Sequence, residues 1–130
     1  MTKTLTVSGR NIRDIPSLYA EINRVFMSGE EWELGESLDA LNDMLGGGYG
    51  AIVGREPVRI LWKDIAESRA ALGFDATRNH LLSKLRRPDV YDAVAIARRI
   101  GELEAGIGQT YVDTVMAIIA DHPNIQLVEA

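Results

Sequence analysis

The chain of 130 residues contains no cysteine, so it has no disulfide framework, no thiol nucleophile and no thiolate metal site. It also lacks any run that approaches the roughly 18 apolar residues of a membrane span. Its first residues, MTKTLTVSGR, contain no apolar signal region. We therefore expect a soluble, cytoplasmic protein that makes no contact with a membrane.

A second absence is local, because no Lys or Arg lies between Val25 and Gly54. The window contains six acidic residues and so has a charge of −6, whereas the whole chain has −5. These acids are Glu30, Glu31, Glu33, Glu36, Asp39 and Asp43. Such a surface repels nucleic-acid phosphates and attracts basic groups. The charge pattern favours a basic protein partner over nucleic acid.

The hydrophobic share of 46% is enough for one core, and we expect a single domain over residues 1–130. Periodicity predicts strands at residues 3–7, 57–62 and 124–128, and helices between Asp14 and Gly29, after Ser37, at 63–72 and at 110–121. Strands separated by helices imply parallel pairing. The predicted fold class is α/β, a small three-stranded parallel sheet with helices packed on its faces.

The stretch GGGYGAIVG at residues 46–54 has the glycine content of a phosphate-binding loop. A phosphate loop follows a strand and opens a helix, whereas here a helix precedes the glycines and a strand follows them. We therefore interpret it as a flexible connector beside the acidic helix, where it could join a binding surface.

Residues 74–108 are slightly basic, with six bases against five acids. We expect a short helix at Thr77 to Leu85 and a longer one opened by Pro88 and Asp89, both packed away from the acidic helix. His80 has no second metal ligand nearby, so a surface or helix-packing role is favoured over a catalytic one.

The stretch ELGESLDALNDML is followed by the glycine-rich loop and PVRILWKDI, and the chain opens with LTVSGRNIRDIPSLYAEI and closes with a helix and a strand. This order of segments resembles the barstar family of ribonuclease inhibitors. Residues that match the family motif are Gly35, Leu38, Asp39, Ala40, Leu41, Asp43 and Leu45. Residues 74–108 have no counterpart in this resemblance and are interpreted as a mainly helical insertion.

The resemblance implies an inhibitor rather than an enzyme, without catalytic residues, metal or cofactor. Its partner would be a small, basic, secreted, barnase-like ribonuclease. Asp43 would take the place of the RNA phosphate among active-site cations, and Asp39 would meet an active-site arginine. The candidate partner-binding residues are Trp32, Glu33, Leu34, Gly35, Glu36, Asp39, Asn42, Asp43, Gly47, Tyr49 and Asp121.

The aromatic anchors of the family are missing or shifted. Asn42 stands where the family has Trp between the two aspartates, Glu33 replaces an aromatic beside Trp32, and a loop Trp falls at Gly47 or Gly48 with Tyr49 nearby. The family's acid in the last helix aligns with Ala117, one turn before Asp121. Because aromatic anchors set selectivity, we expect inhibition of a different nuclease, or weak inhibition of barnase.

Three alternatives remain open. The domain could bind a partner that is not a nuclease, with residues 74–108 as the interface. It could be an enzyme in which Glu36, Asp39 and Asp43 act as acid, base or metal ligands, although that chemistry needs a concave, desolvated site. The acids could also form an ordinary solvated helix face.

Overall fold

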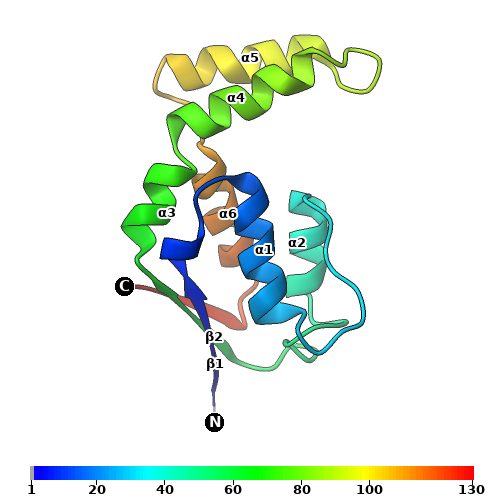
Figure 1. Cartoon of the computed structure of the whole chain (residues 1–130), viewed down its shortest axis with the longest axis vertical. Helices are drawn as coiled ribbons and strands as arrows, with labels where there is room; N and C mark the ends of the chain where they lie inside the picture. Colours follow the sequence, from blue (N-terminus) through cyan, green and yellow to red (C-terminus); the bar gives the residue numbers. More distant parts are fainter. Residues whose placement is uncertain (1) are drawn as a thin grey trace.

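The computed structural model describes residues 2–130, and its centre is a small parallel sheet (Figure 1). The strands are β1 (Lys3–Ser8), β2 (Val58–Lys63) and β3 (Ile125–Glu129), in the order β1-β2-β3. Both pairings are parallel and place Leu5 opposite Ile60, which lies opposite Leu127. The predicted three-stranded parallel α/β sheet is confirmed, and each strand boundary differs from its predicted position by at most one residue.

The helices follow one another between the strands (Figure 1). They are the 3-10 turn η1 (Gly9–Asn11), α1 (Ile15–Phe26), α2 (Leu38–Leu45), α3 (Ile65–Ala71), α4 (Phe74–Leu85), α5 (Ala93–Glu104) and α6 (Tyr111–Ala120). Helix α1 packs against β1, α6 against β3 and α2 against α6. The main core fills the space between these elements.

Only one face of the sheet is covered by helices. Along β2, Val58, Ile60 and Trp62 are buried, whereas Arg59 and Lys63 between and after them are exposed. Parallel strands that are covered on both faces show near-continuous burial instead. The predicted packing of helices on the sheet is confirmed, and the alternating polar residues of β2 explain how the other face stays in water.

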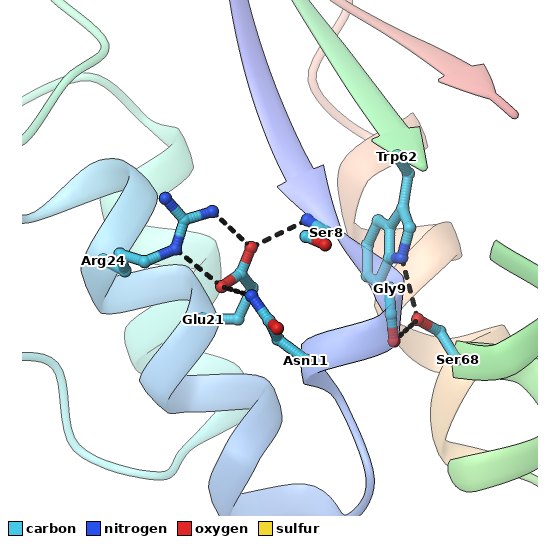
Figure 2. Close-up of polar contacts among 7 residues, drawn as sticks. All are labelled: Ser8, Gly9, Asn11, Glu21, Arg24, Trp62 and Ser68. Atoms are coloured by element: carbon cyan, nitrogen blue, oxygen red, sulfur yellow. Dashed lines mark hydrogen bonds and ion pairs between the residues drawn. The ribbon is translucent and has the colours of Figure 1, made fainter. Parts of the chain in front are cut away.

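Two groups of polar contacts lie at the end of β1 (Figure 2). The buried Glu21 carboxylate of α1 accepts hydrogen bonds from Ser8 N at 2.7 Å and Asn11 Nδ2 at 3.2 Å, and pairs with Arg24 at 2.6 Å. Beside it, the indole of Trp62 donates to Ser68 Oγ at 2.9 Å. These contacts connect α1, β1, β2 and α3 at the edge of the core.

Helices α4 and α5 form a hairpin that projects from the end of α3, remote from the sheet (Figure 1). The hairpin has its own apolar cluster of Leu81, Ile96, Ile100 and Leu103. Helix α4 begins three residues before the predicted Thr77, because the chain turns directly at Gly73 without a side-chain cap. Helix α5 begins at Ala93 rather than near Pro88, because the side chain of Asp92 caps it.

Within residues 2–130, no helix has both the length and the apolar composition that crossing a membrane requires.

Candidate functional site

Helix α2 displays the acidic residues on its outer side. Ser37 caps it by accepting a hydrogen bond from Ala40 N at 3.2 Å. Leu41, Met44 and Leu45 point into the core, as the sequence predicted. Asp39, Asn42 and Asp43 are exposed. Asp39 and Asp43 are four residues apart and therefore share one face of the helix.

Glu36 does not belong to that helical row, because it precedes the cap Ser37 and lies outside the helix. Its negative charge is close enough to raise the pKa of Tyr111, which burial raises first. The hydroxyl of Tyr111 lies 2.6 Å from that of Tyr19. The three acidic residues therefore lie at two places: Glu36 and Asp39 at the start of α2, and Asp43 near its end.

An aromatic pair stands beside the Asp43 end of the helix. The rings of Trp32 and Tyr49 come from two different loops and lie 4.8 Å apart, inclined at 55°. Burial raises the pKa of Tyr49, and the negative charge of Asp43 raises it further. Trp32 is 46% exposed, so much of its ring faces solvent. The structure thus joins two aromatics that are distant in the sequence next to Asp43.

The glycine-rich loop is not the flexible connector expected from its composition. Gly54 N donates to Gly47 O at 2.8 Å, Ala51 N donates to Phe26 O at 2.8 Å, and Ile52 is buried in the core. Gly47 itself is buried and has a φ of +86°, and a Cβ there would lie 2.0 Å from the carbonyl oxygen of Gly54. Gly47 therefore shapes the loop from a buried position, and its part in partner binding stays a prediction.

Leu34, another candidate contact residue, is buried. Its side chain is only 6% exposed and belongs to the main core. Its backbone exchanges two hydrogen bonds with the Asn23 side chain of α1, at 2.7 and 3.3 Å. Leu34 thus anchors the loop before α2, while Glu33 and Gly35 on either side of it remain exposed.

The end of α6 lies beside α2. His122 Nε2 and Asn42 Oδ1 are 2.9 Å apart, and the exposed Asp121 precedes His122 at the end of α6. Asn42, which stands where the family has Trp, therefore has His122 as a hydrogen-bonding partner within the chain, and the sequence did not indicate this contact. This contact spans 80 residues, so no local pattern could have predicted it.

A groove of about 380 Å³ separates the start of α2 from the helical hairpin. Its lining residues are Glu36, Ser37, Leu38, Asp39, His80, Lys84, Tyr91 and Tyr111. The hairpin does not cover Asp43, yet it does approach the acidic helix at its other end. Helix α4 packs on α5 and beside Tyr111 at the start of α6, so the hairpin packs away from α2 as expected and faces the start of α2 across the groove.

His80 packs within this groove in the way expected of a helix-packing histidine. Its ring stands edge-on to Tyr111 with centroids 5.4 Å apart. Burial lowers the pKa of His80, and the charges of Lys84 and Arg99 lower it further. Across residues 2–130, no group of three or more His, Asp or Glu side chains is placed to hold a metal ion.

Comparison with known families gives one match. Residues 2–98, about three quarters of the chain, match the family described as Barstar (barnase inhibitor). This range includes residues 74–98, so the interpretation of 74–108 as an insertion stays a prediction. The comparison with curated proteins finds no match. With most of its length inside the matched range and a parallel sheet that supports an acidic α2, this chain belongs to the barstar family.

Proposed function

We propose that this protein inhibits a small, basic, secreted ribonuclease by covering its active site with α2 and the adjoining loops. The proposal places the inhibitor in the cytoplasm, where a nuclease made for export would otherwise attack the cell's own RNA. The protein would act by binding and would catalyse no reaction, in keeping with a family described as inhibitors of barnase.

The observation that best supports this proposal is the uncompensated acidic surface around α2. Asp39 and Asp43 share an exposed face, and the sequence from Val25 to Gly54 supplies no cation. Repulsion between neighbouring carboxylates is unfavourable in the free protein and is relieved when a basic cleft covers them. The same field increases the rate of encounter with a basic partner.

Asp43 is the best candidate for the carboxylate that replaces an RNA phosphate. It lies near the end of α2, next to the Trp32 and Tyr49 pair and to the exposed Gly46 and Gly48, which let a partner approach closely. In this proposal Trp32 and Tyr49 take over the part of the family's missing aromatic anchors. Asp39, one turn earlier, meets a second cation.

The test is inhibition of barnase by the wild-type chain and by Asp43→Ala, Asp39→Ala and Glu31→Ala. We expect Asp43→Ala to weaken binding by about 2 to 5 kcal/mol, a range that the barnase–barstar pair itself helped to set. The reason is that cations in the nuclease lose their partner. Asp39→Ala should have the second largest effect. Glu31→Ala should mainly slow association, and only at low salt.

A loss of inhibition in Glu31→Ala as large as that in Asp43→Ala would mean that the acids act as a diffuse field, and would end the phosphate-mimic assignment. A pull-down from the secreted fraction of the source organism tests the partner directly, by looking for a small basic ribonuclease.

The second candidate function, a partner that is not a nuclease, is favoured by one observation. The groove beside the hairpin brings cationic and aromatic residues to α2.

A further inference from the structure

The groove between α2 and the hairpin has walls of opposite charge. Glu36 and Asp39 line one side, and Lys84 lines the other with Tyr91 beside it. The ammonium of Lys84 lies 5.2 Å from the centroid of the Tyr91 ring. Within residues 2–130, none of Glu36, Asp39 and Lys84 takes part in an ion pair.

Unpaired opposite charges across a groove of this size leave space for a ligand that matches both walls. A single cation would satisfy Glu36 and Asp39 but would be repelled by Lys84, and a single anion would meet the reverse conflict. A chain segment with both charges satisfies both walls. Tyr91 is 37% exposed and adds an aromatic surface on which a planar guanidinium stacks better than an ammonium does.

We propose that this groove receives a loop of the partner protein in which an arginine side chain is adjacent to a carboxylate. The arginine lies between Glu36 and Asp39 and against Tyr91, and the carboxylate pairs with Lys84. The hairpin thereby selects among basic nucleases, whereas Asp43 provides contacts that all of them share. The identity of the partner rests on the proposed function, but the preference of the groove for paired charges does not.

The first experiment titrates the ¹⁵N-labelled full chain with three peptides: acetyl-Arg-Glu-amide, acetyl-Arg-Gln-amide and acetyl-Gln-Glu-amide. We expect acetyl-Arg-Glu-amide to shift the amide signals of residues 36–39 and 84–91. It should bind about threefold more tightly than either singly charged peptide, as expected for one added exposed ion pair. Lys84→Gln should abolish the preference for acetyl-Arg-Glu-amide over acetyl-Arg-Gln-amide. Lys63→Gln, which alters a lysine at the far end of β2, should not change it.

The second experiment measures inhibition of barnase by Lys84→Gln and Tyr91→Ala. Each variant should inhibit about threefold less well than the wild type, and Lys63→Gln should match the wild type. Equal inhibition by wild type and both hairpin variants would overturn the proposal, as would peptide shifts scattered over all exposed acids. If wild type does not inhibit barnase, the proposed function fails for that enzyme, and the peptide titration alone decides whether the groove binds paired charges.

Discussion

The two ends of helix α2 present different surfaces, although one short helix supplies both. At its end, Asp43 stands beside an aromatic pair and a glycine loop, with no Lys or Arg in the surrounding sequence. At its start, Glu36 and Asp39 face Lys84 and Tyr91 across a groove. In the proposed complex, the first surface binds any strongly basic cleft, whereas the second binds only a partner with a matching charge pattern. The proposal therefore implies that affinity and selectivity can change separately.

Gly47→Ala should disrupt the Asp43 end most strongly. A φ of +86° is unfavourable for alanine by about 1 to 2 kcal/mol, and the new Cβ would meet Gly54 O at 2.0 Å. We expect a loss of at least about 2 kcal/mol in the free energy of unfolding, measured by urea denaturation. Gly48→Ala is the matched control, because nothing lies within 4 Å of a Cβ there. Equal stability of the two variants would show that the loop adapts.

Glu21→Gln should lower the free energy of unfolding of the domain, and so affect both ends of α2 equally. Burial raises the pKa of Glu21, but hydrogen bonds from Arg24, Ser8 N and Asn11 outweigh it, so the net pKa lies below its ordinary 4.5. The stabilisation is therefore present above pH 4.5 and is lost as pH falls through the folded-state pKa. We expect a loss of about 2 kcal/mol at pH 7 and a shallower decline in acid, measured by urea denaturation from pH 7 to 3. An unchanged pH profile would contradict the assignment.

Trp32→Ala should show that the Asp43 end of α2 contributes more to the affinity for barnase than the hairpin end does. We expect about tenfold weaker inhibition of barnase, or about 1.4 kcal/mol, because an exposed aromatic anchor beside Asp43 is lost. Phe74→Ala removes an aromatic of similar exposure, 44% against 46%, from the hairpin end. It should leave inhibition unchanged. Similar losses in both variants would mean that the aromatic pair at the Asp43 end has no special part in binding.

Asn42→Ala tests the middle of the helix and should have the smallest effect. It removes the contact with His122, which is exposed to solvent, so the free energy of unfolding should fall by about 0.5 kcal/mol. Thermal unfolding would measure this loss. A change in inhibition larger than that of Trp32→Ala would instead place Asn42 at the centre of the interface.

Local sequence patterns were sufficient to predict the sheet and helix α2. Alternating or continuous apolar residues predicted the three strands, and Ser37 with its inward leucines predicted the helix. Patterns failed where a contact joins distant segments. The pairing of Trp32 with Tyr49 and the placement of Lys84 and Asp39 along one groove depend on how whole elements pack. Spacing along the chain therefore does not predict them.

Burial is the other property that local patterns do not predict. Leu34 lies within the matching stretch of sequence among exposed neighbours, yet its side chain enters the core. Gly47 is a candidate contact residue because the family's loop Trp falls at Gly47 or Gly48, yet Gly47 is buried. Its positive φ and its close approach to Gly54 are properties of the folded loop, and composition alone does not distinguish them from those of a flexible connector.

The separate apolar cluster of the hairpin has a consequence for cooperativity. Leu81, Ile96, Ile100 and Leu103 form a second, smaller cluster, so α4 and α5 are held together by a core of their own and are joined to the domain mainly through α6. Units with few buried contacts open at lower free energy than the domain that supports them. One wall of the groove therefore stands on the less stable unit. A ligand that contacts both walls stabilises the folded hairpin. Local unfolding of the hairpin in turn lowers the observed affinity for that ligand.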